Sequence, residues 1–438
     1  MFRQDVKLPY TPVFAPHSIQ AAINNLTPDR SWKEKVVCKG KFTISAPLLL
    51  PSYTILDLSK AVITLADASD CDMIRNAEIV AGNTQIEVIG GILGGNGANQ
   101  GALILRGINL IKVSSLSLDS VQVNNVGKDG TASVGIMADQ CTNGVIGNCT
   151  VKDASNYGIS LWRSRHMRVS HGYAENNGRA VGGHQYAVTG DVTEQTADVT
   201  LDGNIAVLKQ NTQNGFQCYH SRRIVIDGNV VLGDPAGLDG IRMGDCYHMI
   251  VSANLLYNLT AGMGVKDATA GYNPAKYVKI VDNIIDTAGY GVYVAGENVK
   301  VGGNQVLNTT DDGIAIAPTA TLVSVKGNIV FEAGKHGIVI NANSVIVNGN
   351  HVVNSADDVA GRDGIRLEVV SDCVVTGNRC YDTQEPKTQN YGIREYTGSD
   401  YNIITGNNLR GNLTGGLLVV GANTLYRTVT DLDPLNVV

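Results

Sequence analysis

The chain has 438 residues, of which 43% are hydrophobic and 17% charged, with 50 glycines but only 5 phenylalanines. The charged fraction lies well below the ~25% of ordinary soluble domains, which excludes a disordered chain and a coiled coil. The net charge of −6 excludes a broad basic surface for nucleic acid, and no apolar run is long enough for a transmembrane helix.

The N-terminal segment predicts a short cap. Its first residues contain no apolar signal-peptide core, so we expect either that the protein is not exported by that route or that a leader is missing from this sequence. In the segment 18–26, Ile19, Ala22, Ile23 and Leu26 recur at helical spacing, and Ser18 stands at the N-cap position. We expect a helix here that covers the open end of a stacked structure.

From residue 133 onward the chain repeats two short signatures, and the segment 36–125 follows the same pattern less regularly. One is a glycine followed by an apolar strand, as in 157–162, and the other is an alternating strand that ends in Gly-Asn, as in 223–229. The asparagine of the second signature recurs every 21–29 residues between Asn204 and Asn407. A repeat of two or three short strands cannot bury its apolar side alone, so successive coils must stack at ~4.8 Å.

These repeats predict an all-β fold, a single-domain right-handed parallel β-helix (a solenoid) with a short N-terminal capping helix. The handedness follows from the usual chirality of parallel crossovers. We expect one domain over residues 1–438, with a cap at 1–35, coils at 36–424 and a C-terminal tail at 425–438. Stacked asparagines are expected to hydrogen-bond along the stack, and the eight cysteines to be small buried side chains.

Aligning the coils on the glycine places the outward residues in columns. The middle coils collect aromatic, basic and acidic side chains over about five coils, roughly 20–25 Å at ~4.8 Å per coil. An outward tryptophan suits stacking against a sugar ring. The candidate substrate-binding residues are Trp162, His184, Gln217, Asp239 and Tyr293.

Arg242 and Lys266 lie one coil apart in this alignment, and Tyr219 and His220 lie one coil before Arg242. A neighbouring Arg and Lys neutralise a uronate carboxylate, which lowers the pKa of the sugar C5 proton and allows β-elimination. The candidate catalytic residues are therefore Arg242 as the carboxylate clamp, Lys266 or His220 as the base, and Tyr219 as the acid.

Acidic residues beside this set leave two interpretations open. Asp245 and Asp267 are candidate calcium ligands, because calcium takes several oxygen ligands, and no other cofactor is indicated. Alternatively, salt bridges from Arg242 to Asp239, Asp245 or Asp267 form an ordinary solvated face.

The repeat pattern resembles the pectate-lyase-like superfamily of β-helix proteins over nearly the whole chain. The glycine-rich segment 82–97 is similar to an early coil of its polygalacturonase-related members. The resemblance implies secreted or phage-borne proteins that act on polysaccharides as lyases, hydrolases or C5-epimerases, and it also includes non-enzymatic spikes that are often trimers.

Polygalacturonase-type hydrolases carry Asp-Asp, Gly-His-Gly and Arg-Ile-Lys motifs in this order. Asp311 and Asp312 before a glycine, and His336 before the next, are similar to the first two motifs, whereas Arg366 lies in an Ile-Arg-Leu sequence. The resemblance implies an alternative catalytic set of Asp311, Asp312 and His336. The epimerase motif Tyr-Gly-Phe-Asp-Pro-His is matched only in its frame by 157–162, which lacks the acid and the histidine.

The sequence thus predicts a polysaccharide-active β-helix enzyme, with β-elimination of a uronic-acid-containing polysaccharide as the leading reaction. Hydrolysis, C5-epimerisation and non-enzymatic carbohydrate binding are the alternatives. We expect an acidic polysaccharide as the partner, no nucleic acid, no membrane span, a monomer or homotrimer, and a secreted, extracellular or phage-borne location.

Overall fold

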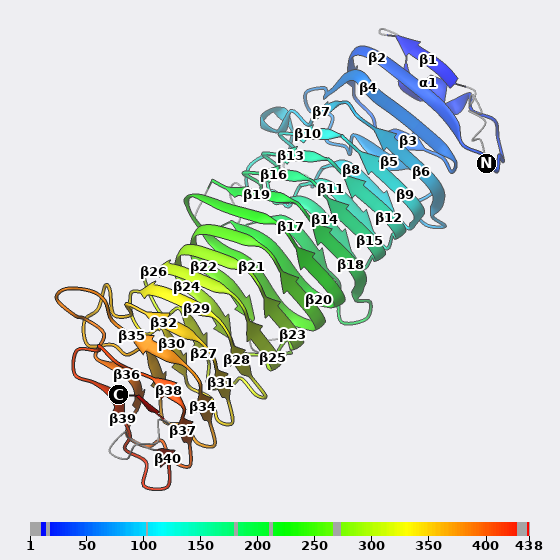
Figure 1. Ribbon diagram of the computed structural model, residues 1–438. Helices are drawn as coiled ribbons and strands as arrows, with labels where there is room; N and C mark the ends of the chain where they lie inside the picture. The colour runs from blue at the N-terminus through cyan, green and yellow to red at the C-terminus, as the bar shows by residue number, and fades with distance from the viewer. Residues whose placement is uncertain are drawn as a thin grey trace, which may run out of the picture. The chain divides into compact units, whose positions relative to one another are not determined.

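The computed structural model describes residues 10–14, 18–101, 104–178, 183–209, 213–265, 273–426 and 436–437 (Figure 1). These residues form parallel strands throughout, with one short α-helix. The chain divides into two compact units, residues 1–221 and 222–438, and both are built from the same stacked coils. The single-domain organisation predicted for the chain stays a prediction.

The predicted capping helix is present. Helix α1 (Ile19–Asn24) begins after Ser18, whose Oγ accepts a hydrogen bond from the Ala21 N–H at 3.2 Å. Ile19 and Ile23 are buried, as the helical spacing predicts. Strand β1 (Tyr10–Phe14) pairs in parallel with β2 (Glu34–Ile44), so it joins the first coil together with the helix.

Three parallel sheets make up the coils of residues 1–221. The sheet whose strands contain the repeated glycine is called the Gly-led sheet, and the next two along each coil are the second and third sheets. The remaining strands of this unit are β3 (Leu48–Leu50), β4 (Thr54–Leu65), β5 (Ile74–Asn76), β6 (Asn83–Ile89), β7 (Ile92–Gly94), β8 (Arg106–Ile111), β9 (Val113–Asp119), β10 (Gln122–Asn124), β11 (Val134–Asp139), β12 (Thr142–Gly147), β13 (Thr150–Lys152), β14 (Tyr157–Trp162), β15 (Arg165–Ser170), β16 (Tyr173–Glu175), β17 (His184–Thr189), β18 (Thr196–Asp202), β19 (Ile205–Leu208) and β20 (Asn214–Asp227).

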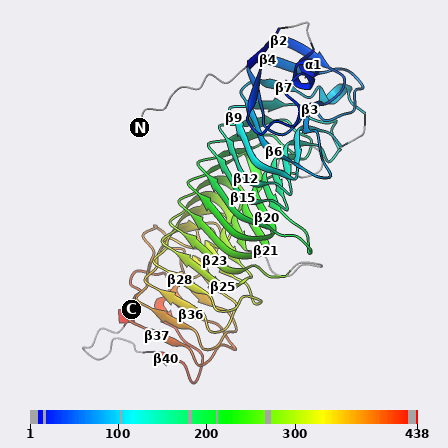
Figure 2. The same ribbon diagram turned by 90° about the vertical axis from the view of Figure 1, so that its right-hand side faces the viewer.

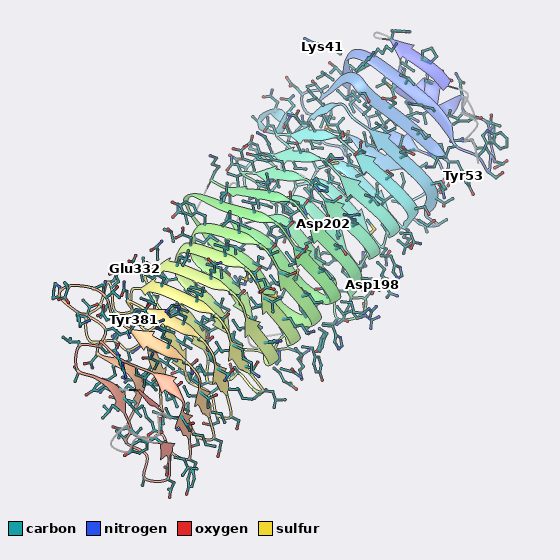
Figure 3. All side chains as sticks on the ribbon, in the orientation of Figure 1. Lys41, Tyr53, Asp198, Asp202, Glu332 and Tyr381 are labelled. Carbon is teal, nitrogen blue, oxygen red and sulfur yellow. The ribbon has the colours of Figure 1, made fainter. Side chains whose placement is uncertain are left out.

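The second sheet of this unit carries ion pairs on its outer surface. Asp202 of β18, labelled in Figure 3, accepts two hydrogen bonds from Arg168 of β15 at 2.8 and 2.7 Å. Asp198, also labelled, lies 3.5 Å from His166. Both pairs join neighbouring coils, because β15 and β18 are adjacent strands.

The coils of residues 222–438 show the same three-sheet pattern, and most of their strands are short. The long strands β22 and β24 of this unit run from the third sheet into the Gly-led sheet, and β21 continues through the Gly-led sheet into the second sheet. The strands are β21 (Val230–Ser252), β22 (Leu255–Val265), β23 (Lys276–Val281), β24 (Ile284–Val294), β25 (Glu297–Gly302), β26 (Gln305–Thr309), β27 (Ile314–Ile316), β28 (Ser324–Lys326), β29 (Ile329–Ala333), β30 (Ile338–Ile340), β31 (Ile346–Asn348), β32 (His351–Val353), β33 (Ile365–Leu367), β34 (Val374–Thr376), β35 (Arg379–Tyr381), β36 (Tyr391–Glu395), β37 (Ile403–Thr405), β38 (Asn407–Asn408), β39 (Gly415–Leu418), β40 (Leu425–Tyr426) and β41 (Asn436–Val437).

The interior of each coil is filled by aliphatic side chains. Ile314, Ile338 and Ile365 pair with one another on β27, β30 and β33 and are fully buried. None of the eight cysteines forms a disulfide, and all except Cys71 are buried, which confirms the expectation of small core side chains for seven of them. Leu425, the first residue of the predicted tail, pairs with Ile403 of β37, and the predicted tail boundary stays a prediction.

A row of buried asparagines links successive coils of residues 222–438, as the repeat predicts. The row begins at Asn229, and the Oδ1 atom of every later member accepts hydrogen bonds from the backbone and the side-chain amide of the asparagine one coil earlier; these members are Asn254, Asn283, Asn304, Asn328, Asn350, Asn378 and Asn407. Their backbone donors lie at turns between strands, so the side chain replaces bonds that the sheets do not provide.

Among the described residues, no helix combines the length and the apolar character that crossing a bilayer demands.

Replacing Asn350 by alanine should destabilise the fold by about 3 kcal/mol, because several buried amide groups on neighbouring coils lose their partners. Asn348→Ala is the matched control: this residue is exposed, and its side chain donates to Thr376 on the surface. Chemical denaturation of the two variants measures the difference. Equal stabilities would show that the asparagine row contributes nothing.

Candidate active site

The glycine of each coil is preceded by a residue that stacks on its counterpart in the next coil. The backbone N–H groups of Gly313, Gly337 and Gly364 donate to the carbonyls of the residues that precede the glycine one coil later, at 2.9–3.2 Å. We call this series the site column, and its members in order are Tyr290, Asp312, His336, Asp363 and Tyr391.

The glycines bring these coils close together. A Cβ atom on Gly313 would lie 2.7 Å from the Gly337 carbonyl oxygen, and one on Gly337 would lie 2.2 Å from a methyl group of Val352. Both distances are shorter than a van der Waals contact, so only glycine fits. The same spacing that requires glycine therefore sets the polar residues just before it on adjacent rungs.

The two acids of the alternative set each contact a residue one coil later. Asp311 forms an ion pair with Lys335 one coil away, with Oδ2 and Nζ 2.7 Å apart. Asp312 Oδ1 accepts a hydrogen bond from the His336 backbone N–H at 3.0 Å. Burial raises the pKa of Asp312 to about 6, and the negative charge of Asp311 adds to the effect.

His336 is buried and held in one tautomer. Its Nδ1 accepts the Asp363 backbone N–H at 3.0 Å, so a neutral ring carries its proton on Nε2. Burial, with the nearby charge of Arg366, lowers the pKa of His336 to about 3. The 3.8 Å approach of Asp363 Oδ2 to His336 is therefore not an ion pair at neutral pH.

Asp363 and Arg366 form a buried pair beside the histidine. The guanidinium donates to Asp363 at 2.8 Å and to Glu368 at 2.7 Å, and it lies over the Tyr396 ring at 4.2 Å. Burial raises the pKa of Asp363, while Arg366 opposes the rise. Asp363 and Arg366 are only 0% and 7% exposed, because they cover each other.

The next strand places a second arginine directly beside Arg366. Arg394 pairs directly with Arg366 across β33 and β36, and its guanidinium lies 5.6 Å from the Tyr391 ring and 5.8 Å from the Tyr396 ring. Its Nε atom is buried without a hydrogen-bond partner, and no described carboxylate lies within ion-pair distance. The sequence analysis did not identify Arg394. It stands two residues after the repeated glycine, as Arg366 does, and this position was a usable signal.

The alternative set from the sequence is thus brought together: Asp311, Asp312 and His336 lie on two adjacent coils. Their catalytic role stays a prediction. The structure adds Lys335, Asp363 and the two arginines around them.

The predicted residues in the first unit divide into buried and half-buried positions. His184 is 7% exposed, stacks on the Tyr157 ring at 5.2 Å, and its Nδ1 lies 2.9 Å from the Asn214 amide. Trp162 and Tyr219 share one column, in which Thr189 lies between them, and Tyr219 is 9% exposed. Their substrate-binding and catalytic roles stay predictions.

Gln217 and His220 are half-buried residues of β20. His220 has a left-handed backbone conformation, with φ of 46°. The roles assigned to both residues from the sequence also stay predictions.

In the second unit, the salt-bridge interpretation of Arg242 is supported. Its guanidinium lies 3.6 Å from the buried Asp239 carboxylate. Arg242, Gly264 and Tyr293 occupy one column on adjacent strands, so the middle position has no side chain. Lys266, predicted as the base, lies outside the described residues.

The calcium site at Asp245 and Asp267 stays a prediction. Asp245 is 3% exposed, and Asp267 lies outside the described residues. Within the part of the chain that the structure describes, no three His, Cys, Asp or Glu side chains gather in a way that would hold a metal ion.

The stacked coils define the class of protein: a parallel β-helix. A family model described as a right-handed β-helix region matches residues 106–296 and 210–361, which together cover more than half of the chain. The protein therefore belongs to the right-handed β-helix family, in agreement with the predicted pectate-lyase-like resemblance. No curated protein sequence matches the chain.

Solved structures confirm the fold. Pre-mature gene product 12 of bacteriophage phi29 matches with a TM-score of 0.63 and 15% identity over 92% of this chain and 54% of that chain. The tailspike protein of E. coli bacteriophage HK620 with a pentasaccharide gives 0.54 and 14% over 92% and 75%. The catalytic domain of a GH87 α-1,3-glucanase with tetrasaccharides gives 0.53 and 13% over 91% and 70%.

Asp312→Asn should change how stability depends on pH. Because the folded-state pKa of Asp312 is raised to about 6, its favourable contribution is present below pH ~4 and is lost as the pH rises through 6. The variant should therefore gain up to about 3 kcal/mol relative to the unmodified protein between pH 4 and 7. Urea denaturation of both proteins at several pH values measures this difference.

The two proteins must be compared because His336 changes the stability with pH in the direction opposite to Asp312. Its lowered pKa removes stability as the pH falls below ~6.5 toward 3. This contribution is common to both proteins and cancels in their difference. A difference that does not vary with pH would contradict the raised pKa of Asp312.

Proposed function

We propose that this protein is a polysaccharide-active β-helix enzyme that hydrolyses glycosidic bonds at Asp311 and the site column. The observation that carries the proposal is the juxtaposition of two carboxyl groups in different environments. Asp312 is the acid with a pKa raised to about 6, and Asp311 is ion-paired with Lys335. Glycoside hydrolysis needs one carboxyl group that donates a proton and one carboxylate.

The proton of Asp312 would pass to the glycosidic oxygen as its bond to the anomeric carbon breaks. The Asp311 carboxylate would accept a proton from the water that adds to this carbon, so the reaction consumes one water molecule. His336, neutral with its proton on Nε2, would donate a hydrogen bond to a sugar hydroxyl.

The arginines favour an acidic substrate. Arg366 is already paired with Asp363 and Glu368, whereas Arg394 has no described carboxylate partner and lies beside two tyrosine rings. A uronate carboxylate would complete its hydrogen bonding. The oligosaccharide complexes of the HK620 tailspike and the GH87 glucanase, which share the fold, are consistent with a glycan ligand.

β-Elimination at Arg242, with Lys266 or His220 as base and Tyr219 as acid, is the second candidate. Gly264, which lies between Arg242 and Tyr293 in their column, favours β-elimination, because no side chain at this position would block a sugar ring from the arginine. Against it, Asp239 already neutralises part of the Arg242 charge. We also propose that the protein is located outside the cell or on a phage, and that it is a monomer or a homotrimer.

Incubation with polygalacturonate, alginate, glycosaminoglycans and neutral glycans tests the proposal. We expect reducing ends to appear with an acidic polysaccharide and no ultraviolet absorbance of an unsaturated uronate. Asp312→Asn should lower the rate by at least about 100-fold, and the rate should decline as the pH rises above about 6, since Asp312 must be protonated. Asp372→Asn, at an exposed acid whose left-handed backbone asparagine tolerates, is the control.

Other outcomes would redirect the assignment. Ultraviolet absorbance that is lost in Arg242→Ala but kept in Asp312→Asn would establish the eliminase instead. Retention on a polysaccharide gel without any product would indicate a binding protein.

A further inference from the structure

The second sheet of residues 222–438 carries an aromatic pair that the active site does not use. His248 of β21 and Tyr277 of β23 occupy one column on adjacent coils, with ring centroids 4.9 Å apart and planes inclined by 8°. Tyr277 is 45% exposed. His248 covers one face of the tyrosine ring, and the next residue in the column, Asn298, is too short to stack on the other face.

A surface hollow of about 360 Å³ adjoins this pair, and it is lined by His248, Ile250, Tyr277, Lys279, Asn298 and Lys300. Its volume lies within the range of small-ligand sites, ~300–1,000 Å³. Strands β21, β23 and β25, which form its floor, are successive rungs on the side shown in Figure 2.

The side chains around this hollow are positively charged, whereas the whole chain has a negative net charge. Lys279 and Lys300 pair directly on adjacent strands, about one strand spacing apart, and both are exposed. Lys326, on the following strand, is also exposed. Among the described residues, none of these three ammonium groups has a carboxylate partner, whereas Lys276 beside them is paired with Glu297 at 2.6 Å.

We propose that this hollow is a second glycan-binding site that takes an acidic saccharide without acting on it. A sugar ring presents C–H groups on its face, which pack on an aromatic ring, and a uronate presents a carboxylate at its edge, which ammonium groups bind. The tyrosine face and the lysine pair supply both contacts within one hollow. The site lies on a different sheet from Asp312 and does not depend on the proposed hydrolysis.

The position suits a polymer rather than a single sugar. Lys279 and Lys300 lie one strand spacing apart, so a chain that runs along the coil axis meets a positive group on two successive rungs, with Lys326 two residues further along the next strand. The protein's charge of −6 does not favour a nucleic acid, which needs a broad basic surface. Holding an acidic polysaccharide here would keep the polymer near the catalytic sheet between cleavage events.

Binding of polygalacturonate to the Asp312→Asn protein tests the inference without turnover. The Lys279→Gln/Lys300→Gln double variant should bind about tenfold more weakly, and binding should weaken with added salt. Tyr277→Asn should lower the affinity similarly, and asparagine tolerates the left-handed backbone at this position, where φ is 57°. Melting temperatures of the variants establish that they are folded.

The matched control is Lys41→Gln/Lys60→Gln, which removes the same charge from exposed lysines of β2 and β4; Lys41 is labelled in Figure 3. Its affinity should equal that of the parent. Equal affinity of the Lys279/Lys300 variant and the parent would overturn the inference, as would tighter binding of a single-stranded oligonucleotide than of polygalacturonate. Loss of hydrolysis in Asp312→Asn with unchanged binding would separate this site from the proposed function.

Discussion

The hydrogen bonding between one coil and the next is the constraint on which this structure depends. Each strand must lie about 4.8 Å from its counterpart, and every backbone group that faces a neighbour must find a partner there. A side chain at the point of closest approach would push the coils apart. Glycine at positions such as Gly313 and Gly337 removes that obstacle, because a Cβ atom there would meet a backbone carbonyl of the next coil.

This constraint also builds the candidate active site. A residue that precedes such a glycine is fixed on its rung, and its side chain lies beside those of the rungs above and below. Polar groups placed there become buried by one another, as Asp363 and Arg366 are. Burial then changes their acidity, so Asp312 and His336 acquire pKa values of about 6 and about 3 from the packing that holds the fold together.

Most of the fold was predictable from the sequence, because each coil repeats the same pattern of buried positions. The capping helix at Ile19–Asn24, the Gly-led strands and the asparagine row each have a local signal that recurs or stands at a known spacing. The alternative site residues Asp311, Asp312 and His336 were also within reach, since their register follows from the glycine beside them.

The environments of these residues were not predictable. An alternation of inward and outward positions cannot show that Arg366 folds back onto Asp363, or that Asp239 reaches Arg242, because these contacts depend on side-chain torsions. The column that holds Arg394 was visible, but its lack of a carboxylate partner depends on what neighbouring coils place around it. Sequence periodicity therefore predicts positions, whereas ionisation and pairing require the packed structure.

The hydrogen bonds between the asparagines from Asn229 to Asn407 all have one direction, because each asparagine accepts at Oδ1 from the asparagine one coil earlier. A complete turn could be inserted or removed without leaving an amide stranded, whereas a cut within a turn would break the sequence of donors and acceptors. The length of this half of the molecule is thus adjustable in whole-turn increments, which offers gene duplication a simple route to longer or shorter relatives.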